Sequence, residues 1–147
     1  MSPSKQGHCL CGAVQVQVDG LADEISACFC DLCMRFGGGL QMGIEAKPDT
    51  VRITGPVKSH RSSALAERAW CDDCGSPIWF RYVAGRDHGY LELSPGLFSN
   101  AGDARLTRVV YADRYPDGYW IEGHSVAHIS QRDYEAKNPH LNDGVVP

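Results

Sequence analysis

"CDDCG" at residues 71–75 places two cysteines on one tight turn, and "CLCG" at residues 9–12 repeats this arrangement near the start of the chain. In both stretches a glycine follows the second cysteine, where a positive φ angle would turn the backbone and bring N–H groups to face the sulfur atoms. Two such pairs supply the four thiolates of a closed, tetrahedral zinc site. The predicted ligands are Cys9, Cys11, Cys71 and Cys74.

A metal held by both pairs would tie the first predicted strand to a distant hairpin. Closing so long a loop restricts the unfolded chain, and the expected gain in stability is several kcal/mol, on the order of that from a disulfide. Two alternatives are open at this point. Iron also binds four thiolates, and the four cysteines could be buried without any metal.

Three more cysteines stand close together in "ACFCDLC" at residues 27–33. The total of seven is odd and the spacings are two or three residues, which indicates metal binding rather than disulfides. Catalytic zinc sites have three protein ligands and keep the fourth position for water or substrate. Cys28, Cys30 and Cys33 therefore predict a second zinc site of the catalytic type. The two groups could also be mixed, or a histidine could complete a closed second site; the candidates are His8, His60, His88, His124, His128 and His140.

Composition and charge exclude several classes of protein. The chain has 147 residues, enough for one domain with an ordinary core, and no repeat or linker divides it. Its 14 Lys and Arg are scattered among 18 Asp and Glu, which argues against a nucleic-acid partner. No apolar run is long enough to span a membrane, and the N-terminus has no apolar segment of the signal type, so we expect a cytoplasmic protein with reduced thiols.

Short segments with strand-like alternation, separated by turn residues, predict a mainly β fold with antiparallel sheets and little helix. The expected strands are residues 13–20, 40–44, 51–54, 77–83, 90–94 and 106–112. Ser130 and Asp133 resemble a capping box and predict a short helix through about Lys137. Residues 138–147 are expected to form a loose tail after a single domain that spans residues 1–137.

Three motifs together resemble a known family. In order and spacing, "GHCLCGAV" (7–14), "CFCDLCMRFGG" (28–38) and "WCDDCGSPIWF" (70–80) resemble the zinc-binding core of the glutathione-dependent formaldehyde-activating enzyme (GFA) family, which also includes the domain of centromere protein V. The resemblance implies an Mss4-like β-tent, in which antiparallel sheets are pinned by a structural zinc on Cys9, Cys11, Cys71 and Cys74. It also implies a second, catalytic-type zinc on Cys28, Cys30 and Cys33.

The type reaction of the family is the addition of the glutathione sulfur to formaldehyde, which gives S-hydroxymethylglutathione. The resemblance therefore implies a zinc-dependent carbon–sulfur lyase with two zinc ions per chain, glutathione as co-substrate and a small aldehyde as second partner. Arg35, close to the three cysteines, is predicted to bind a glutathione carboxylate. Asp31 stands where many members carry serine, so it could contact the surroundings of the metal, repel an anionic thiolate or face solvent.

Other functions are open on the sequence alone. A non-catalytic zinc module would mediate protein contacts and bind no thiol, whereas a different enzyme of the family would act on another substrate. A sulfoxide reductase of the same fold needs a reactive cysteine away from the structural zinc, and no cysteine follows Cys74. The sequence therefore favours a thiol–carbonyl enzyme over redox chemistry.

Overall fold

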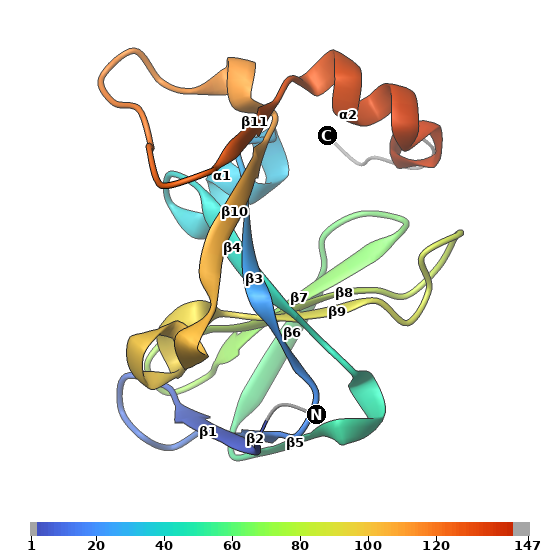
Figure 1. The fold of residues 1–147 in the computed structure, drawn as a ribbon. Coiled ribbons are helices and arrows are strands. Elements are labelled where there is room, and N and C mark those ends of the chain that lie inside the picture. The colour runs from blue at the N-terminus through green and yellow to red at the C-terminus, as the bar shows by residue number, and fades with distance from the viewer. Residues whose placement is uncertain (1–2, 143–147) are drawn as a thin grey trace.

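The computed structural model describes residues 3–142, and strands make up most of the regular structure in this part of the chain (Figure 1). A small antiparallel sheet contains β1 (Lys5–His8), β2 (Gln15–Val18) and β5 (Val51–Thr54). It lies at the bottom of Figure 1. In β2 the sequence QVQV alternates exposed and buried residues, as a strand with one wet face requires.

A larger sheet of eight strands forms the rest of the frame. In order across the sheet they are β11 (Ala127–Ile129), β10 (Arg105–Val110), β3 (Leu21–Cys28), β4 (Gln41–Ala46), β9 (Leu91–Leu93), β8 (Pro77–Tyr82), β7 (Ala66–Cys71) and β6 (Val57–Arg61). The mainly β fold with little helix is confirmed. Two parallel pairs, β10 with β3 and β10 with β11, add to the antiparallel pairs that were predicted.

The parallel pairing of β10 follows from the way the chain returns to the sheet. After β9, two short 3-10 helices lead the chain to the end of the sheet where β3 begins, and a Cβ on Gly102 would meet the side chain of Leu21 there. β10 therefore starts beside the start of β3 and runs in the same direction. Figure 1 shows both strands crossing the middle of the molecule from bottom to top.

Short helices connect and flank the strands. They are α1 (Asp31–Gly37), α2 (Gln131–Lys137) and the 3-10 helices η1 (Pro48–Thr50), η2 (Pro95–Leu97), η3 (Ser99–Asp103), η4 (Ala112–Arg114) and η5 (Pro139–Asn142). Both α-helices lie at the upper end of the view in Figure 1. None of the helices in residues 3–142 combines the length and the hydropathy that are needed to cross a membrane.

The predicted helix near the C-terminus is confirmed. Ser130 is its N-cap, and the Ser130 Oγ accepts a hydrogen bond from the backbone N–H of Asp133 at 3.1 Å. The residues that follow α2 differ from the loose tail that was expected, because η5 forms there and His140 Nε2 lies 2.6 Å from Asp87 Oδ2. Residues 143–147 of the expected tail lie outside the described residues.

All six expected strands coincide with strands of the structure, namely β2, β4, β5, β8, β9 and β10. The strands that were not predicted include two whose apolar pattern is irregular. β3 has a register shift between Leu21 and Ile25 where it pairs with β4, and this shift breaks the alternation. β6 is polar and exposed after Val57, because it is the last strand of the sheet.

Two buried clusters hold these layers together. The first lies between the sheets, where Val16 of β2 packs in one core with Ile44 of β4 and Leu93 of β9. The second lies at the other end of β3 and β10 and contains Phe29 and Val109, both fully buried. Phe29 stands between two of the cysteines of the ACFCDLC stretch, so its burial anchors the backbone on both sides of it.

Candidate functional site

The four cysteines of the glycine-flanked pairs converge on one point. Their sulfur atoms all lie within 4.8 Å of one another, with 3.6 Å between Cys9 and Cys11 and 3.9 Å between Cys11 and Cys71. A tetrahedron with metal–sulfur bonds of about 2.3 Å has edges of about 3.8 Å. The group formed by Cys9, Cys11, Cys71 and Cys74, called the four-cysteine group below, therefore fits a tetrahedral metal ion.

The local backbone explains why glycine follows each pair. Gly12 has a φ angle of +80° and Gly75 of +78°, the left-handed region that was predicted. A Cβ at either position would meet no atom within 4 Å, so the requirement for glycine comes from the backbone conformation and not from crowding. The backbone N–H of Gly75 donates a hydrogen bond to the carbonyl oxygen of Cys71 at 2.8 Å, and this bond closes the turn that carries Cys71 and Cys74.

Polar contacts favour the thiolate form of two cysteines of the four-cysteine group, Cys9 and Cys74. The Cys9 Sγ accepts a hydrogen bond from the backbone N–H of Val14 at 3.2 Å. The Ser76 hydroxyl oxygen accepts a hydrogen bond from the backbone N–H of Leu10 at 3.0 Å and lies 3.2 Å from the Cys74 Sγ. Ser76 therefore connects the turn that carries Cys9 and Cys11 to the turn that carries Cys71 and Cys74. The contact with Ser76 lowers the pKa of Cys74 to about 5.

The three remaining cysteines form a second group, called the three-cysteine group below. Cys28 ends β3, Cys30 is the N-cap of α1, and Cys33 lies in the first turn of α1. Their sulfur atoms lie within 4.8 Å of one another. The backbone N–H of Cys30 donates to the Cys28 Sγ, and that of Cys33 to the Cys30 Sγ, each at 3.4 Å. This is the partition of the seven cysteines that was predicted.

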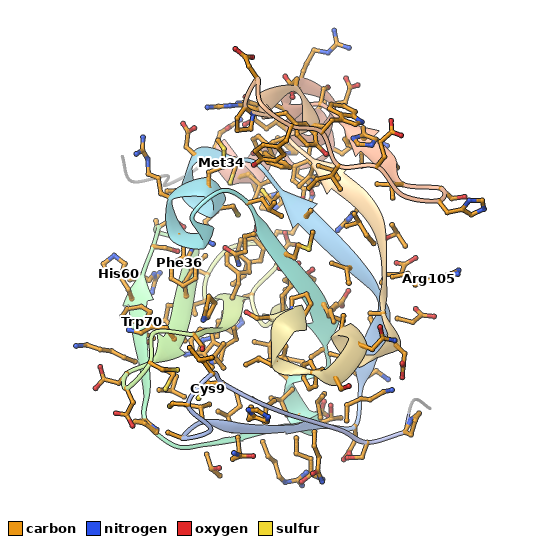
Figure 2. All side chains as sticks on the ribbon, turned by 90° about the vertical axis from the view of Figure 1, so that its left-hand side faces the viewer. Cys9, Met34, Phe36, His60, Trp70 and Arg105 are labelled. Carbon is orange, nitrogen blue, oxygen red and sulfur yellow. The ribbon has the colours of Figure 1, made fainter. Side chains whose placement is uncertain are left out.

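Within the described part of the chain, no fourth protein ligand completes the three-cysteine group. Among residues 3–142, no histidine, carboxylate or further cysteine comes close enough to join the three sulfur atoms. Figure 2 labels Cys9 near the small sheet and Met34 of α1 near the opposite end of the molecule, so the two cysteine groups lie far apart. The geometry fits one closed metal site and one with a free position.

The pKa values of the thiols in the three-cysteine group differ strongly. Hydrogen bonds from the thiols of Cys28 and Cys33 lower the pKa of Cys30 to about 2. Hydrogen bonds with the thiols of Cys30 and Cys33 raise the pKa of Cys28 well above its ordinary value. Cys30 is therefore the first sulfur of the group to ionise, and the group carries negative charge at neutral pH.

A buried arginine balances that charge. Arg68 on β7 is only 4% exposed, and its Nη2 lies 3.6 Å from the Cys33 Sγ. Its guanidinium lies over the ring of Phe36, whose centroid is 5.4 Å away, and over that of Phe80, at 4.9 Å. Figure 2 labels Phe36 on α1, close to Trp70 of β7. Because a buried charge is stable only when it is paired, the three-cysteine group and Arg68 stabilise each other.

The three-cysteine group opens into a cavity of about 530 Å³. One wall is the large sheet, and alternation along the strands selects its residues: Ser26 and Cys28 of β3 face the cavity, whereas Ala27 between them is buried in the second core. The C-terminal part of the described chain supplies an opposite wall. Its lining residues are Gln131, Tyr134, Glu135, Asn138, Leu141 and Asn142.

Asp31, whose role the sequence left open, forms an ion pair with Arg114 at the edge of the cavity. Arg114 belongs to η4 and also donates to the Gln131 side chain at 3.3 Å. The aspartate therefore connects the start of α1 to η4 and, through Arg114, to the start of α2. Its carboxylate is used in this contact and does not join the sulfur atoms.

Arg35 is the one predicted site residue that the structure places elsewhere. It is exposed on α1 and is not among the residues that line the cavity. The Cys33 side chain points toward the other two sulfur atoms of the three-cysteine group, and a residue two positions later on a helix points about 200° away from it. The arginines that do line the cavity are Arg68, Arg108 and Arg114. They come from β7, β10 and η4, and no local motif connects them to the cysteines.

Comparisons with known proteins agree with this geometry. The model of the family described as glutathione-dependent formaldehyde-activating enzyme matches residues 4–114. An uncharacterized lyase of Schizosaccharomyces pombe is 28% identical over 119 residues, which are 80% of this chain and 85% of the relative. A crystal structure of a Rhodobacter sphaeroides protein is similar in fold, with a TM-score of 0.54 and 21% identity over 69% of this chain and 99% of that chain. The family match covers all seven cysteines, and the chain therefore belongs to the glutathione-dependent formaldehyde-activating enzyme family.

Proposed function

We propose that the protein is a zinc-dependent carbon–sulfur lyase that joins a thiol, glutathione, to a small aldehyde at the three-cysteine group. The observation that carries this proposal is the position of the three sulfur atoms, which lie together in the wall of the cavity with no fourth protein ligand among residues 3–142. The family match and the lyase name of the yeast relative support the same class of reaction.

The three-cysteine group fits zinc in its donor set and in its charge. Three thiolates are soft ligands of the kind that zinc selects, and the backbone N–H groups of Cys30 and Cys33 already point at sulfur. Zinc held there would supply an open coordination position and a Lewis acid. Arg68 keeps Cys33 in place and offsets the negative charge of the three sulfurs, so an anionic thiol substrate meets less repulsion.

Arg108 has the features expected of a carboxylate-binding residue in this cavity. It lines the cavity from β10, where it lies directly opposite Ser26 of β3, two residues before Cys28. Its Nε donates to the Ser26 hydroxyl at 3.1 Å, and within the described part of the chain no carboxylate lies within salt-bridge distance of it. A free guanidinium of this kind can bind a substrate carboxylate through two hydrogen bonds.

The contribution of the protein would be positioning. Thiols add to formaldehyde without help, so acceleration depends on holding sulfur and carbonyl together in the right orientation. A cavity of about 530 Å³ lies within the usual range of sites for small molecules, about 300–1,000 Å³. Reduced thiols are needed at both cysteine groups, and we therefore propose the cytoplasm as the site of action.

The test is the rate of S-hydroxymethylglutathione formation, followed by NMR with zinc-loaded protein. Wild type is expected to exceed the uncatalysed rate, and Arg108→Gln is expected to raise KM for glutathione about tenfold or more with little change in kcat. A hydrogen bond to a charged group contributes about 1.5–3 kcal/mol, which corresponds to this range.

Arg105→Gln is the matched control, because Arg105 lies on the same strand and is exposed like Arg108 but does not line the cavity (Figure 2). Its KM should equal that of wild type. A wild-type rate equal to the background would exclude formaldehyde activation. Equal KM values for all three proteins would exclude Arg108 as the carboxylate site.

A further inference from the structure

A carboxyl group faces the cavity from β9, near the middle of the large sheet. Glu92 is directly opposite Phe80 of β8, and Phe80 is directly opposite Arg68 of β7. Residues that lie opposite each other on adjacent strands share a face of the sheet. Glu92 therefore lies on the face that carries Arg68, and all three residues line the cavity with the three-cysteine group.

The neighbouring strand provides the space that this carboxyl group occupies. Gly43 lies inside β4, where a glycine weakens a strand because it has no side chain to pack. A Cβ at this position would overlap the carboxyl group of Glu92, and its contacts would include both Oε2 and the Glu92 Cβ. The Glu92 side chain can therefore occupy this space only because residue 43 is glycine, although glycine is unfavourable in a strand.

In the part of the chain that the structure describes, the Glu92 carboxyl group has one close hydrogen bond and no close cation. The Tyr90 hydroxyl donates to Glu92 Oε1 at 2.6 Å, while Arg68 and Arg108 act on it only from a longer distance. Within residues 3–142 no Lys, Arg or His lies within salt-bridge distance of it. Burial raises the pKa of Glu92 above its ordinary value, although the hydrogen bond from Tyr90 opposes this shift.

We propose that Glu92 is a catalytic residue that transfers the proton in the addition step; this inference rests on the proposed function. The Glu92 carboxylate takes the proton of the substrate thiol. The sulfur electron pair forms the new carbon–sulfur bond, and the π pair of the carbonyl moves to oxygen. That oxygen then takes the proton back from Glu92, which restores the carboxylate and gives the hydroxymethyl thioether without any further reagent.

Glu92→Gln tests this role, because glutamine keeps the shape of the side chain and an oxygen that can accept from Tyr90. With zinc content equal to that of wild type, kcat for glutathione and formaldehyde is expected to fall about 100-fold or more, with little change in KM. Glu24→Gln is the matched control: Glu24 lies on β3 of the same sheet but is exposed and does not line the cavity. This control should keep the wild-type kcat.

A second variant separates chemistry from structure. Glu92→Ala should be as slow as Glu92→Gln, and added acetate should restore a measurable part of its rate, because a small carboxylate can enter the space and carry the proton. Glutamine at position 92 should also raise the melting temperature at pH 8. The folded pKa of Glu92 is raised, so its ionisation destabilises the wild-type fold as the pH increases through that pKa.

The outcomes distinguish the two proposals. A wild-type rate equal to the background would overturn the proposed function and this inference with it. A wild-type rate above the background that is unchanged in Glu92→Gln would overturn this inference alone. Loss of zinc or a lower melting temperature in Glu92→Gln at pH 8 would assign Glu92 a structural role, and absence of acetate rescue would likewise count against proton transfer.

Discussion

Cys71→Ser is expected to leave most of the protein unfolded at 25 °C. Cys71 is fully buried, and its sulfur lies 3.9 Å from that of Cys11, 60 residues away in the chain. A cross-link that closes a loop of this length contributes about 4 kcal/mol through the unfolded chain alone, a large part of the 5–15 kcal/mol that stabilises a typical domain. Loss of the metal contacts adds to this cost.

Far-UV circular dichroism and zinc content measure this effect. The variant should lose the strand signal and both zinc ions, and a strong chelator should unfold the wild type in the same way. The comparison variant is Cys30→Ser, which is expected to keep the strand signal. A Cys71→Ser protein that melts within a few degrees of wild type would contradict a structural metal at the four-cysteine group.

Cys30→Ser is expected to reduce the rate of S-hydroxymethylglutathione formation to the uncatalysed level. The Cys30 Sγ caps α1 by accepting from the backbone N–H of Cys33, and a serine Oγ is among the best N-caps, so the helix should remain. A neutral hydroxyl is a poor zinc ligand compared with a thiolate, so the second metal should be lost.

Zinc analysis and kinetics together check this prediction. Zinc should fall from two ions per chain to one, while the melting temperature changes little. Met34→Leu is a suitable comparison, since Met34 lies on the same helix and packs in the second core rather than in the cavity. Full activity of Cys30→Ser with one zinc ion would show that the three-cysteine group takes no part in the reaction.

The sequence predicted the parts of the site that depend on local geometry. Two cysteines that stand two or three residues apart on a tight turn bring their sulfur atoms close together whatever the rest of the fold is, and Gly12 and Gly75 marked the positions that need a positive φ angle. The N-cap of α2 at Ser130 could also be predicted from the sequence, because a capping box involves only one turn of chain.

The parts that were missed depend on pairing between distant segments. Arg68 and Glu92 stand in strands where a charged residue is read as solvent-exposed, and only the order of β7, β8 and β9 shows that they share the cavity with the cysteines. Arg35 was chosen because it is near the cysteines in sequence, but helix geometry turns it away from the cavity. Gly43 becomes informative only when the neighbour that fills its space is known.

Anomalous diffraction at the zinc edge, from crystals grown with glutathione, tests most directly whether one metal site is closed and the other open. Two peaks are expected. One should lie among the four sulfurs of Cys9, Cys11, Cys71 and Cys74, and the other on Cys28, Cys30 and Cys33 with the glutathione sulfur as fourth ligand. A zinc-loaded protein with no peak at the three-cysteine group, or with a protein side chain in the fourth position, would contradict an open site.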